Sequence, residues 1–222
     1  MWNYISPSEA VKGGGGIMGV VMFITIDGGD GCGKTTQQQR LCEWLRSMGR
    51  DVVLCRDPGG TELGDKVREI VLNGGVGICN VAEMFLFMAS RAQLVEEVIR
   101  PSVLAGKDVI SDRFLISNIV YQGYAGGVSI EEVESSGRIA TSGILPDVGI
   151  ILDVPYEVGV GRIGERAKDR MERKGEEYHK RVRNGFLEYA QKNRLYVVID
   201  AVPPPEEVEQ EIRKILLKQG NF

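Results

Sequence analysis

The sequence predicts an α/β three-layer sandwich, with a five-stranded parallel sheet flanked by helices and a mobile lid over one edge. Two observations predict this fold. Five short apolar runs alternate with stretches of helical periodicity, which is the pattern of a parallel sheet covered on both faces. The first run leads into a glycine-rich turn and then a helix, as at a phosphate-binding loop (P-loop). The chain has 222 residues, of which 43% are hydrophobic, so it can form one domain with a substantial core.

We expect residues 1–21 to be a flexible leader and residues 22–222 to be a single domain. The leader has a glycine run at Gly13–Gly16 but no periodic pattern, and it lacks the apolar segment of a secretory signal. A cloning remnant or a start codon placed too far upstream are alternatives, and Met18 and Met22 are both plausible starts. The net charge of −4 does not suggest a nucleic-acid-binding surface, and no apolar run is long enough to cross a membrane.

The apolar runs place the strands of the sheet, and the ends of those strands indicate where a ligand binds. The predicted strands are Met22–Asp27, Asp51–Arg56, Asp108–Ser111, Asp147–Asp153 and Leu195–Asp200. Ligands of open α/β sheets bind at the carboxyl ends of the strands. The residues that follow each strand are therefore the candidates for a functional site.

The first strand ends in the spacing Gly28-x4-Gly33-Lys34-Thr35. Glycines let successive backbone N–H groups converge on an anion, and Lys34 adds a charge for β- and γ-phosphates. The Thr35 hydroxyl suits Mg²⁺, and the following helix directs its positive end at the same phosphates. The residues expected to hold the triphosphate are Gly28, Gly29, Asp30, Gly31, Cys32, Gly33, Lys34, Thr35 and Thr36.

The segment after the second strand predicts a turn and an anion site. Pro58 and the glycines that follow it favour a turn, and Thr61 is a candidate N-cap for the next helix. Arg56 and Arg68 flank this turn at the ligand edge, which favours an anion site over a turn without function.

A long helix is predicted over Val81–Leu104. Its apolar residues Phe85, Leu86, Met88 and Val95 are expected in the core. Phe87 and Arg91 are four residues apart and share a face, where they could hold a planar base by stacking and hydrogen bonding. An apolar stripe that only packs in the core is the alternative.

The third strand leads into Asp112 and Arg113, which suit Mg²⁺ or its water shell and phosphoryl oxygens respectively. A surface salt bridge is the alternative. Asn118 and Gln122 follow on one helical face, and each offers an amide that can bond the edge of a nucleobase.

A basic segment after the fourth strand predicts the lid, over about 157–177. Between Arg162 and Arg183 there are nine basic and five acidic residues, with glycines interspersed, in a chain that is acidic overall. An arginine-rich, flexible segment opposite a phosphate-binding loop suggests closure over a triphosphate, and a solvated charged helix is the alternative. The C-terminal strand, the Pro203–Pro205 break and an amphipathic helix are interpreted as scaffold.

The four cysteines do not form a CxxC pair, so neither a zinc site nor a redox motif is indicated. Buried, reduced thiols in a cytoplasmic protein are the simplest interpretation. Cys32 differs because Lys34 and a helix N-terminus lie beside it and favour its thiolate. We therefore predict that thiol reagents affect activity and that ATP slows their reaction with Cys32.

Five blocks occur in an order and at a spacing that resemble the thymidylate kinases, a branch of the nucleoside monophosphate kinase family. They are Gly-x-Asp-Gly-x-Gly-Lys-Thr at 28–35, Arg-Asp-Pro-Gly-Gly-Thr at 56–61, Leu-Phe-x-Ala-Ser-Arg-Ala-Gln at 86–93, Asp-Arg-Phe at 112–114 with Tyr-Gln-Gly at 121–123, and Asp-Arg-Met-Glu at 169–172 with Arg-Val-Arg at 181–183. The resemblance covers the chain from about Met22 to its end. It implies phosphoryl transfer from ATP to dTMP with Mg²⁺, a cytoplasmic location, and a homodimer formed through the apolar face of the 81–104 helix.

The resemblance also implies roles for individual residues. For the acceptor phosphate and sugar, Arg68 and Arg113 would bind the phosphate, Asp30 would lie near the 3′-hydroxyl, and Tyr121 would lie at the ribose 2′ position. For the base, Phe87 would stack on thymine, Arg91 would bond its O4, and Asn118 and Gln122 would lie at its edge. Asp57 would also contact the acceptor site. In catalysis, Lys34, Arg113, Arg162 and Arg166 would supply positive charge, and Thr35 and Asp112 would place the metal.

The sequence departs from the family pattern at Asp57, Phe114 and Cys32, where Glu, Tyr and Ala are usual. Gly31 stands where some members carry an arginine, so the cation for the transition state must come from the lid, as in the bacterial type. The lid arginines are Arg162, Arg166, Arg170 and Arg173.

Two other functions are compatible with parts of the pattern. A guanylate or adenylate kinase would share the fold and the loop. A nucleotide-dependent switch would share the loop but would have no use for Phe87, Arg91 and Gln122, and no Asn-Lys-x-Asp guanine signature is present.

Overall fold

The computed structural model describes residues 21–164 and 169–218. Most of the expected leader, the centre of the expected lid at 165–168 and the last four residues lie outside the described residues. Val21, at the end of the expected leader, is buried in the core.

Five parallel strands form one sheet in the order β2-β3-β1-β4-β5. Their bounds are β1 Phe23–Gly28, β2 Val52–Arg56, β3 Asp108–Asp112, β4 Val148–Asp153 and β5 Tyr196–Asp200. Each end lies within one residue of its predicted position, so the predicted sheet is confirmed. The central strand β1 carries the candidate loop and is hydrogen-bonded on both sides.

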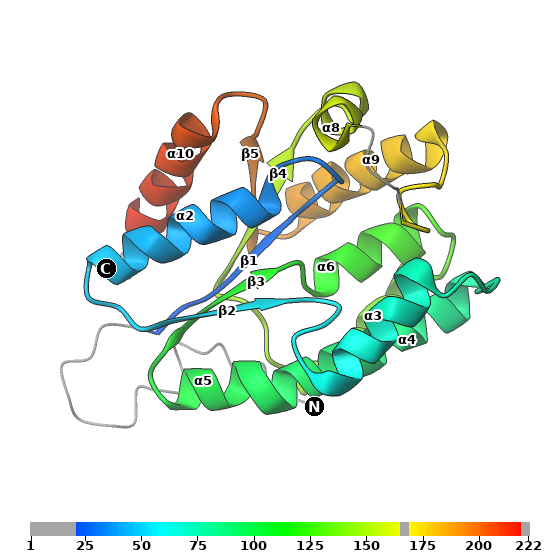
Figure 1. Cartoon of the computed structure of the whole chain (residues 1–222), viewed down its shortest axis with the longest axis horizontal. Helices are drawn as coiled ribbons and strands as arrows, with labels where there is room; N and C mark the ends of the chain where they lie inside the picture. The colour runs from blue at the N-terminus through cyan, green and yellow to red at the C-terminus, as the bar shows by residue number, and fades with distance from the viewer. Residues whose placement is uncertain (1–20, 165–168, 219–222) are drawn as a thin grey trace.

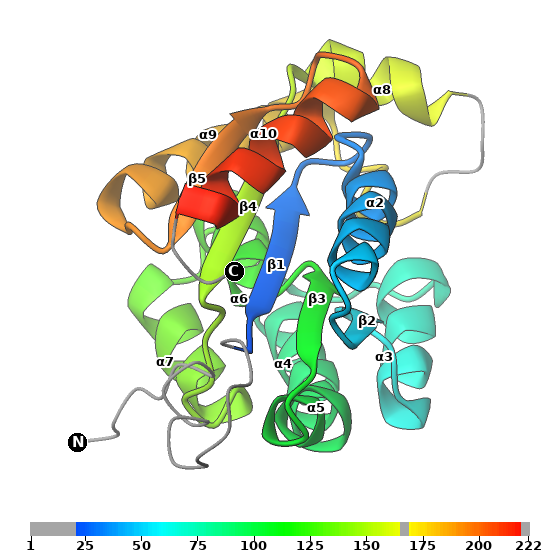
Figure 2. The same ribbon diagram turned by 90° about the vertical axis from the view of Figure 1, so that its left-hand side faces the viewer.

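Helices cover both faces of this sheet, as Figures 1 and 2 show. The helices are α2 Lys34–Ser47, α3 Glu62–Asn73, α4 Asn80–Leu94, η1 Val95–Ile99, α5 Arg100–Leu104, α6 Leu115–Asn118, η2 Ile119–Tyr124, α7 Ile130–Ala140, α8 Tyr156–Ile163, α9 Glu176–Lys192 and α10 Pro205–Lys218. The segments η1 and η2 are π-helical. The three-layer sandwich expected from the sequence is therefore present.

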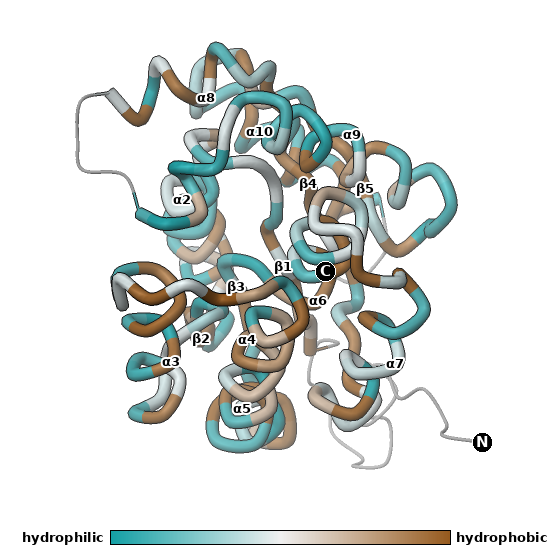
Figure 3. Tube along the Cα trace, turned by 90° about the vertical axis from the view of Figure 1, so that its right-hand side faces the viewer, coloured by the Kyte–Doolittle hydropathy of each residue, from teal (hydrophilic) through white to brown (hydrophobic). Residues whose placement is uncertain are grey.

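Alternation along β1 divides the core between the two faces. Ile24 and Ile26 pack in one cluster with residues of α2 and α10, whereas Phe23 packs in another with residues of α4, η1 and α5. Adjacent side chains of a strand point to opposite faces, so one apolar strand supplies both layers. The visible side of α10 is largely hydrophilic in Figure 3, as expected of an amphipathic outer helix.

The predicted 81–104 helix is present as the continuous series α4, η1 and α5, with a π-helical segment in the middle. The prediction that Phe85 belongs to the core is wrong, because its exposed fraction is 57%. The buried stripe of α4 includes Met84, Phe87, Met88 and Arg91. Phe85 lies outside this stripe, on the exposed part of the helix.

All five strands are parallel, so the segments that follow them emerge at one edge of the sheet. The predicted N-cap at Thr61 is confirmed there, since its Oγ1 accepts a hydrogen bond of 3.0 Å from the Gly64 N–H. In the described part of the chain, no helix is both long enough and apolar enough to cross a bilayer.

Candidate active site

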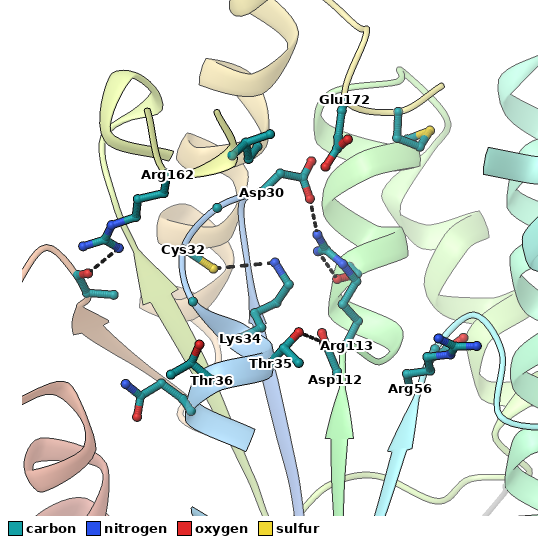
Figure 4. A pocket seen from close by; sticks show the side chains of 18 of the residues that line it. Asp30, Cys32, Lys34, Thr35, Thr36, Arg56, Asp112, Arg113, Arg162 and Glu172 are labelled. Carbon is teal, nitrogen blue, oxygen red and sulfur yellow. Dashed lines mark hydrogen bonds and ion pairs between the residues drawn. The ribbon is translucent and has the colours of Figure 1, made fainter. Parts of the chain in front are cut away.

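A cavity of about 1060 Å³ opens at the carboxyl edge of the sheet. Its walls come from the β1–α2 loop, the turn after β2, the second half of α3, α4, the β3–η2 segment, the end of α8, the 169–172 turn and the segment after β5. Figure 4 shows the polar side chains of one part of this cavity converging from several of these elements. The cavity therefore joins the phosphate-binding loop to the predicted base site.

The loop takes the backbone shape that its glycines permit. Gly33 is the N-cap of α2 with a φ of 97°, and Gly31 has a φ of 75°. A Cβ at residue 31 would clash with the carbonyl of Gly159 in α8. The glycine that replaces the arginine of other family patterns is thus also required by close packing against α8.

The Lys34 ammonium lies within the curve of this loop. It donates a hydrogen bond of 2.8 Å to the Gly29 carbonyl and lies 3.6 Å from the Cys32 Sγ (Figure 4). The Cys32 side chain lines the cavity, but the residue is only 2% exposed. Backbone N–H groups, a helix N-terminus and an ammonium in one loop form an anion site of the kind that holds phosphates.

Thr35 and Asp112 meet at the floor of the cavity, where the Thr35 Oγ1 donates to the Asp112 Oδ2 at 3.1 Å. Pairing of β1 with β3 brings them together, because Ile26 is in register with Asp112. A hydroxyl and a carboxylate are hard oxygen donors, and Mg²⁺ is commonly held by one or two such groups together with substrate phosphates. Among the described residues no cluster of three His, Cys, Asp or Glu could hold a metal by itself. The donor set therefore fits a magnesium ion that arrives with a nucleotide.

Arg113 connects the loop to the rest of the cavity. Its guanidinium donates to the Asp30 Oδ1 at 2.7 Å (Figure 4). It also donates to the Gly28 carbonyl at 2.9 Å and the Tyr121 hydroxyl at 3.3 Å. Its φ of 70° is uncommon for a residue with a Cβ. The backbone turns sharply after β3 and sends this side chain back toward the loop.

The predicted base site is built on a buried ion pair. The Arg91 Nε donates to the Asp57 Oδ2 at 2.6 Å, and both residues are buried. Burial raises the pKa of Asp57, and the charge of Arg91 opposes this rise. Arg91 also donates to the Asn118 Oδ1 at 2.5 Å. Phe87 lines the same part of the cavity.

Two more predicted residues, Arg68 and Arg162, line the same cavity. Arg68 donates to the Pro58 carbonyl at 3.0 Å, across the cis Asp57–Pro58 turn, and burial lowers its pKa. Arg162 in α8 donates to the Ala201 and Val202 carbonyls at 2.8 Å and 2.9 Å. Arg166 lies outside the described residues.

Comparison with known proteins identifies the family. A model of the thymidylate kinase family matches residues 26–212. The thymidylate kinase of Thermoanaerobacter sp. strain X514 is 45% identical over 197 residues, which cover 88% of this chain and 97% of that protein. The thymidylate kinase of Carboxydothermus hydrogenoformans is 43% identical over 195 residues, covering 87% and 96% respectively. The chain belongs to the thymidylate kinase family.

A solved structure supports the same assignment. The thymidylate kinase from Ehrlichia chaffeensis superposes with a TM-score of 0.73 at 34% identity, over 88% of this chain and 98% of that one. The fold is therefore that of a thymidylate kinase over 88% of the chain.

One segment of this thymidylate kinase fold has a role that its sequence did not predict. The segment after β5 was interpreted as scaffold, but Ala201, Val202 and the prolines Pro203–Pro205 line the cavity. The signal that could have found them is their position at the carboxyl end of a parallel strand. Arg162 bonds to this segment, so one predicted lid arginine lies at the border of the cavity.

Glu83 is a further residue that the sequence did not predict, and it lies outside the five thymidylate kinase blocks. Its carboxylate is fully buried and accepts hydrogen bonds from Gln122, Arg170 and Lys174. No local pattern marks it, because its partners lie far from it in the sequence.

Proposed function

We propose that this protein transfers the γ-phosphoryl group of ATP to dTMP, giving ADP and dTDP. The observation that carries the proposal is the single cavity in which the phosphate-binding loop, Arg113 and the Phe87–Arg91 site lie side by side. One cavity with a triphosphate site and a base-binding site suits direct transfer between two nucleotides. Family membership supports dTMP as the acceptor.

In this proposal ATP occupies the loop side of the cavity. The backbone of residues 28–36 and the Lys34 ammonium hold its phosphates, and the positive end of α2 faces them. Thr35 and Asp112 would hold Mg²⁺, which when bound supplies positive charge to the β- and γ-phosphates. The Val202–Pro205 segment and Arg162 border the region beyond the phosphates.

The acceptor occupies the side of the cavity formed by α3, α4 and η2. Phe87 stacks on the thymine ring and Arg91 bonds its O4, while Asn118 and Gln122 lie at the base edge. Arg68 and Arg113 bind the acceptor phosphate, Asp30 lies near the sugar, and Tyr121 restricts the 2′ position. Asp57 acts through its ion pair with Arg91.

The nucleophile is an oxygen of the acceptor phosphate, which is already ionised at neutral pH. The reaction therefore needs no general base, and alignment and charge neutralisation provide the catalysis. Lys34 and Arg113 supply positive charge from fixed positions. Arg162 and Arg166 of the lid, at about residues 157–177, supply the rest of the positive charge, and closure of the lid excludes water.

We further propose a homodimer and a cytoplasmic location. Four apolar side chains on α3 and α4 are 45–57% exposed, and such a surface suits a second copy of the chain: Leu63, Ile70, Val81 and Phe85. All four cysteines are free thiols, three of them buried, as suits a reducing compartment.

The test is the rate of ADP formation from ATP with dTMP, dUMP, GMP and AMP as acceptors, measured in parallel. We expect the highest kcat/KM with dTMP. A preference for GMP or AMP would replace the proposal with a purine nucleotide kinase. ATP consumption that ignores every acceptor would indicate a nucleotide-dependent switch.

A further inference from the structure

Glu83 is a buried carboxylate outside the cavity, and three donors surround it. It lies in the first turn of α4 with no exposed side-chain surface. The Gln122 Nε2 donates to it at 2.7 Å, the Lys174 Nζ at 3.2 Å, and the Arg170 guanidinium forms an ion pair with it. A buried charge is costly unless it is paired, so this cluster depends on all of its members.

On one side Glu83 begins a chain of hydrogen bonds that reaches the base site. The Gln122 Oε1 accepts from the Asn118 Nδ2 at 2.8 Å, and the Asn118 Oδ1 accepts from Arg91 at 2.5 Å. A carboxylate only accepts hydrogen bonds and a guanidinium only donates them. Glu83 at one end of this series and Arg91 at the other therefore require the same orientation of the Asn118 and Gln122 amides. Glu83 thereby helps to decide which atoms of Asn118 and Gln122 face the cavity.

On the other side Glu83 holds the turn at residues 169–174. Arg170 also donates from its Nε to the Val71 carbonyl at 2.7 Å and from its backbone N–H to the Leu72 carbonyl at 3.0 Å. Its neighbours Asp169 and Met171 line the cavity together with Leu72. The pairs from Arg170 and Lys174 to Glu83 therefore hold this turn, which is the last part of the predicted lid, against α4.

We propose that Glu83 is a positioning residue for the acceptor nucleotide, which holds the base-edge amides and the 169–174 turn in a fixed relation. Neither Glu83 nor its partners Arg170 and Lys174 line the cavity. Their effect on the acceptor is exerted through Gln122 and through the wall residues of the turn. The inference rests on the proposed function, because it assigns the base-edge side of the cavity to the acceptor.

Lys174→Gln provides the cleanest test, because Lys174 is at the border of the cluster and Arg170 still pairs with Glu83 in the variant. Lys180→Gln is the matched control, since Lys180 makes the same kind of ion pair with Glu176 on the exposed side of α9. We expect Lys174→Gln to raise the KM for dTMP about three- to tenfold, the range of one net hydrogen bond, and to leave the KM for ATP unchanged. Lys174→Arg should restore the dTMP value, and Lys180→Gln should match the wild type.

Glu83→Gln and the double variant Glu83→Gln/Lys174→Gln complete a mutant cycle. If Lys174 acts through Glu83, the two effects on the dTMP KM are not additive. Equal rises in the KM values for dTMP and ATP, or a Lys174→Gln variant with a wild-type dTMP KM, would overturn the inference. The Lys174→Gln result tests the inference even if Glu83→Gln does not fold. A wild-type enzyme that does not accept dTMP would instead overturn the proposed function.

Discussion

The buried pair of Asp57 and Arg91 makes a quantitative prediction about both stability and substrate binding. Replacing Arg91 by Met preserves the length of the side chain but leaves the Asp57 carboxylate buried without its guanidinium partner, which lies 2.6 Å away in the wild type. Breaking a buried ion pair costs about 3–5 kcal/mol in the free energy of unfolding. For a chain of this size that corresponds to a fall in Tm of about 6–20 °C.

The pH dependence of this loss follows from the pKa of Asp57. Burial raises that pKa above its ordinary value, and Arg91 limits the rise, so Arg91→Met should raise the pKa further. A carboxyl group whose folded-state pKa is raised contributes stability at low pH, and this contribution is lost as the pH rises through that pKa. The deficit of Arg91→Met relative to the wild type should therefore shrink as the pH falls from about 8 to about 5.

The assay is urea unfolding at both pH values, with Asp57→Asn/Arg91→Met as the second variant. That double variant removes both charges and should recover most of the lost stability. Arg138→Met makes the same chemical change at an exposed position of α7 and serves as the control. If Arg91→Met is as stable as the wild type, or if the double variant is no more stable than Arg91→Met, this account of the ion pair is wrong.

The single variant Arg91→Met also tests the base site. Arg91→Met should raise the KM for dTMP by about ten- to hundredfold, the value of a hydrogen bond to a charged group, with a smaller effect on the KM for ATP. Equal effects on both substrates would place Arg91 outside the acceptor site.

Three further predictions concern other parts of the site. Lys34→Ala should lower kcat by about a hundredfold or more while circular dichroism shows an unchanged fold, and near-normal turnover would remove the loop from the mechanism. Asp112→Asn should raise the Mg²⁺ concentration needed for half-maximal rate, with an unchanged Mg²⁺ titration as the contrary result. Burial raises the pKa of Asp27, so protonation at low pH stabilises the folded wild type more than it does Asp27→Asn. In urea unfolding, the wild type should therefore exceed Asp27→Asn in stability by more at about pH 5 than at about pH 8. The opposite trend would contradict a raised pKa for Asp27.

Much of the fold could be predicted from the sequence because its signals are local. The five strands are continuous apolar runs, and parallel pairing buries both of their faces, so their bounds follow from composition within one residue. The loop at 28–35 is likewise local, since its glycines, lysine and threonine are adjacent and the backbone conformation depends on them.

Helix α4 shows the limit of such signals. The sequence suggested that Phe85 is a core residue, yet the stripe that α4 turns inward passes through Phe87 and Arg91 instead. An apolar residue next to a buried stripe looks the same in sequence as one within it. Only the packing of α3 and the sheet decides the rotation of the helix.

The sequence by itself determined the α/β sandwich, the phosphate-binding loop and the family, because each rests on neighbouring residues or on ordered blocks. Tertiary structure alone decided three other features. Gly31 must be a glycine because α8 passes against it, the 201–205 segment lines the cavity, and Glu83 joins Gln122 to the 169–174 turn. The physical reason is that these contacts join residues from about 40 to more than 150 positions apart in the chain, and folding brings such partners together without leaving any local pattern that predicts which ones meet.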